Sequence, residues 1–189
     1  VGIQAGQQFA QGGADEQFTV AHALGGEPHV FVCGLEAQHF VDRHHHQALA
    51  SGHLDLGVSY KPDKRPELWF EPLYNEELRL CVAATHPLAR RRRVRMIELH
   101  HCRMVLLPQQ FSTRGLLDEC FEAAGAQPMV VAELNSIAPM IELIRQTDLA
   151  GIIAETAFTP SPDLRLLPLE DPTPIRVPGL PQRRRHGGA

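Results

Sequence analysis

Histidine and aspartate side chains gather in one short stretch of the chain, with a spacing that could hold a metal ion. They are His39, Asp42, His44, His45 and His46. On a helix, His and carboxylate groups three or four residues apart can share a metal, as in zinc hydrolases. No Glu stands between paired histidines as a general base, and three consecutive histidines point in different directions. We therefore expect an exposed polar run with only adventitious metal affinity, and no dedicated metal site.

Small hydrogen-bonding residues stand at the predicted starts of two helices, at Ser112 and Thr113 and again at Asn135 and Ser136. A helix N-terminus presents backbone amides and a partial positive charge, and so binds carboxylates and other anions. Each helix follows a predicted parallel strand, and ligands bind at that edge of doubly wound sheets. We therefore predict that these residues bind a small anion. The alternative interpretation is that Ser112 and Ser136 only cap their helices, a role worth about 1 kcal/mol each.

Clustered or well-placed arginines could also bind anions. Arg114, in the first turn of the first of these helices, could reach a ligand carboxylate, but an Arg at such a position is more often solvated. Five arginines between positions 90 and 95 resemble a nucleic-acid patch. They lack interleaved aromatic residues and Glu98 follows closely, which favours a solvated linker.

Two pairs of neighbouring carboxylates, Glu76-Glu77 and Asp118-Glu119, are the remaining candidates for acid–base chemistry. Adjacent side chains turn apart, so we expect surface charges at both places. No Gly-rich phosphate loop, Gly-x-Ser-x-Gly elbow or Cys/His pairing occurs. We predict that the chain is not an enzyme and uses no cofactor.

The elements that would position the helix starts lie in the second half of the chain. Strands are predicted over 104–107, 129–134, 151–154 and 164–169, and helices from 112 or 113 to 124 and over 135–146. Gly125 ends the first helix, and Pro139 falls in the first turn of the second. This alternation implies a parallel sheet with helices on its faces. Earlier in the chain we predict strands near Phe31-Val32 and over 54–60, 68–73 and 77–84, and a helix over 39–50.

The overall composition is that of an ordinary globular protein. The chain has 189 residues, of which 43% are hydrophobic and 21% charged, with a formal net charge of −4. That charge argues against gripping nucleic acid unaided. No apolar run is long enough to span a bilayer, and residues 1–10 lack the features of a secretion signal. With four scattered cysteines and no Cys-x-x-Cys pair, we expect reduced thiols and a cytoplasmic location.

A series of short motifs runs in order through residues 48–175. They are Leu54-Asp55-Leu56-Gly57-Val58, Glu71-Pro72-Leu73-Tyr74, Thr85-His86-Pro87-Leu88-Ala89, Phe111-Ser112-Thr113-Arg114, Ala124-Gly125-x-x-Pro128 and Glu133-Leu134-Asn135-Ser136-Ile137. Their order and spacing resemble the effector-sensing domain of LysR-type transcriptional regulators, particularly those of cyanate and aromatic-degradation operons.

The resemblance implies an α/β fold of two Rossmann-like subdomains, similar to type-2 periplasmic binding proteins, with parallel-dominated sheets flanked by helices. Subdomain I would comprise 1–73 and 160–189, and subdomain II 74–159, with the strand at 166–169 leading back to subdomain I. The family's winged helix-turn-helix is absent from this chain. A small anionic effector would bind in the cleft between the subdomains. Gln4 would be a further contact, since the family has a polar residue there.

The implied function is effector sensing by part of a bacterial regulator. The full-length protein would control transcription, bind DNA through its helix-turn-helix and form a homo-oligomer, without a membrane partner. Three alternatives stay open: a solute-binding protein of a transporter, a metal-dependent hydrolase built on the histidine run, and a non-functional truncated fragment. The last arises because Gly12-Gly13 and the segment 178–185 stand where the family has helices.

Overall fold

The computed structural model describes residues 19–21, 30–32, 56–60 and 68–183, and the chain divides into two compact units. The first unit comprises Val1–Tyr74 with Val177–Ala189, and the second comprises Asn75–Arg176. The first division, after Tyr74, lies one residue from the predicted boundary between the subdomains at 73/74. The second division, after Arg176, lies beyond the predicted boundary at 159/160. The strand predicted to lead back to the first unit pairs inside the second.

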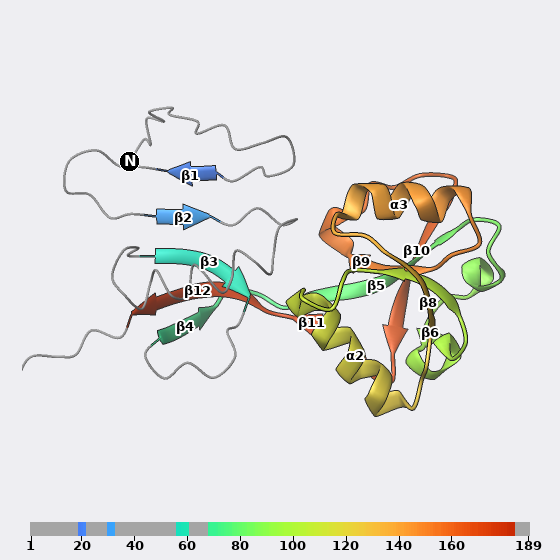
Figure 1. Cartoon of the computed structure of the whole chain (residues 1–189), viewed down its shortest axis with the longest axis horizontal. Helices are drawn as coiled ribbons and strands as arrows, with labels where there is room; N and C mark the ends of the chain where they lie inside the picture. The colour runs from blue at the N-terminus through green and yellow to red at the C-terminus, as the bar shows by residue number, and fades with distance from the viewer. Residues whose placement is uncertain (1–18, 22–29, 33–55, 61–67, 184–189) are drawn as a thin grey trace, which may run out of the picture. The chain divides into compact units, whose positions relative to one another are not determined.

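The first unit contains one five-stranded sheet in the order β1-β2-β3-β12-β4 (Figure 1). The strands are β1 Thr19–Ala21, β2 Val30–Val32, β3 Leu56–Tyr60, β4 Leu68–Pro72 and β12 Pro178–Arg183. β12 runs antiparallel to both β3 and β4. The C-terminal segment that departs from the family pattern in sequence is thus an inner strand of this sheet.

The second unit carries the elements that position the candidate site. Its strands are β5 Glu76–Ala83, β6 Val94–Arg95, β7 Arg103–Leu106, β8 Met129–Glu133, β9 Gly151–Ala154, β10 Leu164–Glu170 and β11 Ile175–Arg176. Its helices are α2 Ser112–Ala124 and α3 Ile137–Gln146, with short 3-10 turns η1 Pro87–Arg90, η2 Met96–Leu99 and η3 Glu155–Ala157. The strands and helices predicted for this half are confirmed within two residues at each end.

The sheets are mixed rather than dominated by parallel pairs. Among the described strands, β7 pairs with β8, β6 with β10 and β2 with β3 in parallel. The pairings of β5 with β9, β10 and β11 are antiparallel. The physical reason is the direction of the chain: β5 runs into the second unit, and β9, β10 and β11 run beside it in the opposite direction. The parallel order predicted from the alternating elements holds for β7, β8 and the bridge from Met104 to Ala150 beside β9.

The two helices cover opposite faces of the second unit's strands (Figure 1). Successive strand residues point to alternate faces, so β5 sends Leu80 into the core under α2 and Cys81 into the core under α3. α2 contributes Leu117 to its core, and α3 contributes Ile144 to the other. Burial raises the pKa of the Cys81 thiol to about 11, so this cysteine is a core residue without nucleophilic character.

Local chemistry fixes the ends of α2 and α3. Gly125 follows α2 in the left-handed conformation, with φ +67°, and its amide bonds back to the carbonyls of Glu122 and Phe121. Pro139 lies in the first turn of α3, where a missing amide is tolerated. Both sequence predictions are confirmed. In the part of the chain that is described, no helix is long and apolar enough to cross a membrane.

Candidate anion-binding site

The starts of α2 and α3 lie at the same edge of the sheet. β7 and β8 are parallel neighbours, and their last residues, Leu106 and Glu133, are paired in register. The Leu134 amide extends the pairing by donating to the Leu106 carbonyl at 3.1 Å. The chain enters α2 after β7 and α3 after β8, so both helices direct their N-termini to this edge. The shared edge predicted from the sequence is confirmed, and the binding of a ligand there stays a prediction.

Neither helix start is closed by a side-chain cap. The N-cap residue of α2 is Phe111, whose side chain makes no cap bond, and Ser112 is the exposed first residue of the helix. The N-cap residue of α3 is Ser136, half-buried and again without a side-chain cap bond, while Asn135 beside it is exposed. The alternative interpretation of Ser112 and Ser136 as capping residues is therefore wrong, and their hydroxyls do not occupy the helix ends.

Thr113 sits differently from its neighbour Ser112. It is only 4% exposed, and its Oγ1 accepts a hydrogen bond of 3.0 Å from Nη1 of Arg176, the last residue of β11. The first turn of α2 is thus tied to a strand 63 residues away. Thr113 is part of an internal polar network as well as of the helix start.

Arg114 is buried, contrary to the expectation of a solvated side chain. It is 6% exposed, because its guanidinium bridges α2 to the ends of both parallel strands. Nη1 donates to the Leu107 carbonyl at 2.8 Å and to Glu133 Oε1 at 2.7 Å, and Nε donates to Asp118 Oδ1 at 2.9 Å. Burial alone would lower the pKa of Arg114, but the bonds to Glu133 and Asp118 outweigh it and raise the pKa. The charge on Arg114 is therefore permanent and is already matched inside the protein.

Glu76 is a residue that sequence reasoning missed. It was expected at the surface, yet it is 4% exposed and pairs through Oε2 with Arg176 Nε. A signal for this was present, because Glu76 is in phase with Leu78 and Leu80 along β5, the two residues that point into the core under α2. Its neighbour Glu77 is exposed, as expected.

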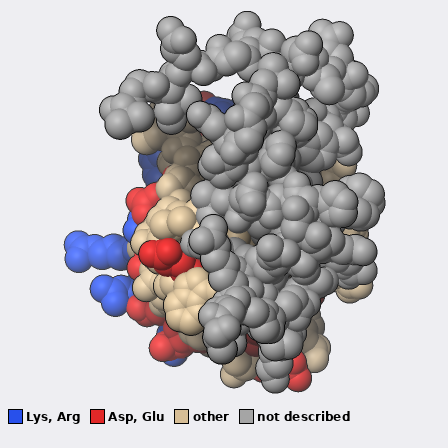
Figure 2. Space-filling view, turned by 90° about the vertical axis from the view of Figure 1, so that its left-hand side faces the viewer, with Lys and Arg blue, Asp and Glu red and all other residues tan. Residues whose placement is uncertain are grey.

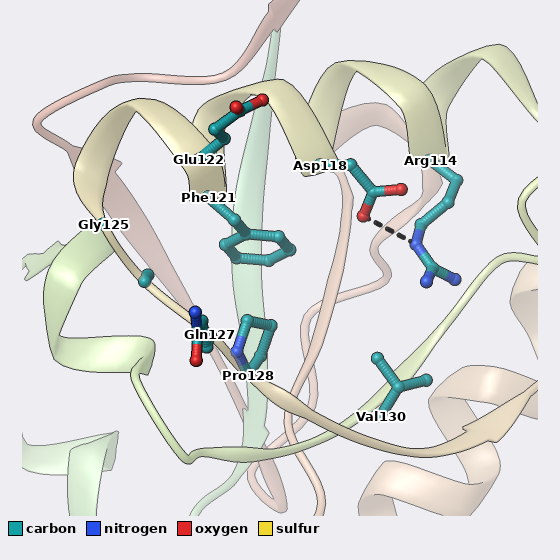
Figure 3. Close-up of a pocket in the computed structure, with 9 residues that line it drawn as sticks. Arg114, Asp118, Phe121, Glu122, Gly125, Gln127, Pro128 and Val130 are labelled. Carbon is teal, nitrogen blue, oxygen red and sulfur yellow. Dashed lines mark hydrogen bonds and ion pairs between the residues drawn. The ribbon is translucent and has the colours of Figure 1, made fainter.

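An open groove of about 470 Å³ lies between α2 and β8. Its walls are the C-terminal half of α2, the turn that follows, and Val130 of β8, with the Arg114–Asp118 ion pair at one end (Figure 3). Ser112, Thr113, Asn135 and Ser136 do not line it. The groove is therefore distinct from the helix starts, and it joins them only through Arg114.

Several candidate residues from the sequence are not part of the site as the structure describes it. Gln4 and the histidine run lie outside the described residues, and within the described ranges no group of three or more metal-ligating side chains converges. Three of the five arginines between 90 and 95 pair with acidic side chains: Arg91 and Arg95 with Glu98, and Arg93 Nη1 with Glu170 Oε2 at 3.1 Å. Basic and acidic side chains lie next to one another on the visible face (Figure 2). Acidic partners therefore interrupt this basic stretch at three of its five arginines.

Comparison with known proteins decides the family. The sequence profile of the LysR substrate binding domain matches residues 34–184. The chain belongs to this family. The match includes both helix starts and the buried network around Arg176, so the described part of the second unit lies inside a LysR substrate binding domain.

Two curated relatives with similar sequences are HTH-type transcriptional regulators. YybE of Bacillus subtilis is 35% identical over 134 residues, which are 69% of this chain and 42% of YybE. SsuR of Burkholderia cenocepacia is 30% identical over 127 residues, 66% of this chain and 41% of SsuR. The chain thus spans less than half the length of these relatives, and they favour a regulator over the transporter alternative.

Solved structures of LysR regulatory domains share the fold. The CcmR regulatory domain of Synechocystis PCC6803, in complex with 2-PG, has a TM-score of 0.67 at 17% identity, covering 80% of this chain and 72% of that one. The effector binding domain of QuiR in complex with shikimate has a TM-score of 0.64 at 20% identity, covering 76% and 68%. The chain therefore has the α/β fold of LysR regulatory domains, similar to type-2 periplasmic binding proteins.

Proposed function

We propose that this chain is the effector-sensing part of a LysR-type transcriptional regulator, that it acts in the cytoplasm without catalysing a reaction, and that its effector is a small anion. The observation that carries the proposal is the pair of helix starts at the carboxyl edge of β7 and β8, neither of which has a side-chain cap. Two N-terminal dipoles aimed at one edge favour a carboxylate or similar anion there.

Within this proposal the exposed residues at the edge contact the effector. Ser112 and Asn135 are exposed and carry hydrogen-bonding side chains, and the half-buried Ser136 stands between Asn135 and the first residue of α3. Thr113 and Arg114 lie beneath them and stiffen the first turn of α2. Gln4 remains a proposed contact on the basis of the family's pattern alone. A rigid turn below adaptable contacts lets the site hold one ligand geometry at low entropic cost.

The experiment is thermal unfolding of the purified chain with aromatic carboxylates, dicarboxylates, cyanate, bicarbonate and sulfate. A ligand present at about 100 times its dissociation constant adds about 2.7 kcal/mol of stability. Ser112→Ala is expected to weaken binding about tenfold, the usual effect of losing one hydrogen bond to a charged group. The matched control is Thr85→Ala, an exposed residue after β5, which ends at the opposite edge. An anion response unchanged by Ser112→Ala would remove this serine from the site.

The full-length regulator is proposed to bind DNA through a helix-turn-helix and to act as a homo-oligomer. Support for self-association comes from β8, which pairs on one side only among the described strands and exposes Met129 at 53% and Val131 at 46%. Uncovered apolar edge strands pair readily with other chains. Val131→Lys is expected to abolish self-association in sedimentation, whereas Ile97→Lys, at an exposed apolar position on η2, should leave it intact.

A further inference from the structure

One buried ion pair joins the two ends of the second unit. Glu76 is the first residue of β5 and Arg176 the last of β11, and the two are direct cross-strand partners. Their side chains are 3% and 11% exposed. The division between the two units falls after Tyr74 and after Arg176. The ion pair therefore joins the segments in which the chain enters and leaves the second unit.

The same pair reaches the first turn of α2. Arg176 uses Nε for Glu76 and Nη1 for the Thr113 hydroxyl, at 3.0 Å. On its other oxygen, Glu76 accepts a hydrogen bond from Thr156 of η3. A guanidinium is a rigid fork, so a shift of one of its partners must be matched by the other. Thr113, Arg176 and Glu76 thus form a continuous polar connection between the helix start and both crossings.

The burial of Arg176 and Glu76 makes the loss of their partners costly. An unpaired charge in this environment is strongly disfavoured, so we expect Arg176 to exchange one acceptor for another rather than lose both. A change at the α2 start that moves Thr113 alters how Arg176 is shared between Thr113 and Glu76. Glu76 begins β5, two residues after the division between the units.

We infer that Arg176 is a positioning residue for the effector site, which holds Thr113 in the first turn of α2 and couples that turn to the two inter-unit strands through Glu76. This inference rests on the proposed function, in which the α2 start binds the effector. Coupling between two places is reciprocal by thermodynamic necessity. A disturbance at Thr113 must loosen the pairing of β5 with β11, and a disturbance at Arg176 must loosen the α2 start.

Hydrogen exchange of the purified, ligand-free chain tests the coupling. The Leu78 amide, which donates to the Pro174 carbonyl at 2.9 Å, reports on β5, and the Gly115 amide, which donates to Phe111, reports on the α2 start. Thr113→Val removes the hydroxyl and keeps the shape, and is expected to speed exchange at Leu78 about tenfold or more. Arg176→Lys is expected to do the same at Gly115, since lysine cannot make both bonds.

Two control variants and one reference amide distinguish coupling between the α2 start and β5 from a general loss of stability. Thr113→Ser keeps the hydroxyl and should leave Leu78 near its wild-type rate, while Arg145→Lys on α3 should leave both reporters unchanged. The Val105 amide, bonded to the Ala150 carbonyl at 2.8 Å, reports on the core, and rates are compared with it. Thr113→Val that leaves Leu78 unchanged relative to Val105 would overturn the inference, as would Arg176→Lys that leaves Gly115 unchanged.

Sulfate, added to the same measurement, separates this inference from the proposed function. Should sulfate slow exchange at Gly115, it must also slow exchange at Leu78, and Thr113→Val must remove the effect at Leu78. Protection confined to Gly115 would contradict the coupling. Failure of sulfate and of every carboxylate tested to protect Gly115 would count against the anion site, while the ligand-free comparison would still decide the role of Arg176.

Discussion

The two helix starts of the second unit share a position but differ in rigidity. At α2, Thr113 and Arg114 are buried and bonded to β11, to Glu133 and to the Leu107 carbonyl. At α3, Asn135 is exposed and Ser136 half-buried, and the Ser136 side chain makes no cap bond. Both starts present helix dipoles to the same edge. Of the two starts, in the part of the chain that the structure describes, the one at α2 is bonded to charged side chains of other elements, Arg176 and Glu133.

The difference teaches how a sensor can be both selective and responsive. In the proposed anion site, a start locked by buried ion pairs would give the anion a fixed geometry and lower the entropy lost on binding. A start with exposed polar residues can adjust to the rest of the ligand. We therefore expect substitutions of the buried residues Thr113 and Arg114 to affect stability, and substitutions of the more exposed residues at the start of α3 to affect mainly ligand preference.

The largest expected effect tests the locked start. Arg114→Met removes the bonds to Glu133, Asp118 and the Leu107 carbonyl from a buried side chain, and should lower the free energy of unfolding by about 2–4 kcal/mol. Arg145→Met on α3 removes ion pairs to Glu142 and Asp163 from a side chain that is 34% exposed, and should lower it by less than about 1 kcal/mol. Urea unfolding measures both. Equal losses would erase the contrast between the helices.

The next effect concerns the far end of α2. Gly125→Ala forces a Cβ into the left-handed conformation and should destabilise the protein by about 1–2 kcal/mol. Gly115→Ala, inside the same helix, has open space for the Cβ and should stabilise by up to about 1 kcal/mol. The two changes in melting temperature should have opposite signs. The same sign for both would mean that the conformation of Gly125 does not decide where α2 ends.

A smaller effect is expected where the two starts are alike. Ser112→Ala and Ser136→Ala should each change the free energy of unfolding by less than about 0.5 kcal/mol, because neither side chain caps its helix. Real capping side chains contribute about 1 kcal/mol. A loss of that size at either serine, measured by urea unfolding without ligand, would restore the capping interpretation for that helix.

The smallest effect on stability is expected at the 3-10 turn η1, whose start does have a side-chain cap. There His86 Nδ1 accepts a hydrogen bond of 3.1 Å from the Leu88 amide. Burial lowers the pKa of His86 below its ordinary 6.5, and Asp148 offsets this only in part. The folded chain therefore binds this proton less readily than the unfolded chain. Its contribution to stability is complete above pH 6.5 and falls as the pH drops below that value.

His86→Asn keeps a capping side chain without a titrating ring. The chain has 11 histidines, so the test is the difference between wild type and variant. Melting temperatures between about pH 5 and 8 should fall less steeply on the acid side for the variant. Parallel curves would show that His86 is not a source of the pH dependence.

Much of the second unit was predictable because its signals are local. The apolar spacing of α2, the glycine that ends it and the apolar run of β9 act through neighbouring residues, and they gave elements correct within two residues. The common edge of the two helix starts followed from the order of strands and helices. The surface assignment of Glu76 failed because its charged partner, Arg176, lies 100 residues away. The expectation of a solvated Arg114 failed because the Leu107 carbonyl and Glu133, its partners outside α2, are brought to it by the fold.

The sequence by itself determined the family, through motifs in order over most of the chain, and the elements of the second unit, through periodicity and helix-ending residues. Only the tertiary structure decided which charges are buried, where the chain crosses between the units, and that the C-terminal segment is an inner strand. The physical reason is that a buried charge is stable only beside a partner. The partner of Glu76 is Arg176, 100 residues further along the chain, and no local pattern records that distance.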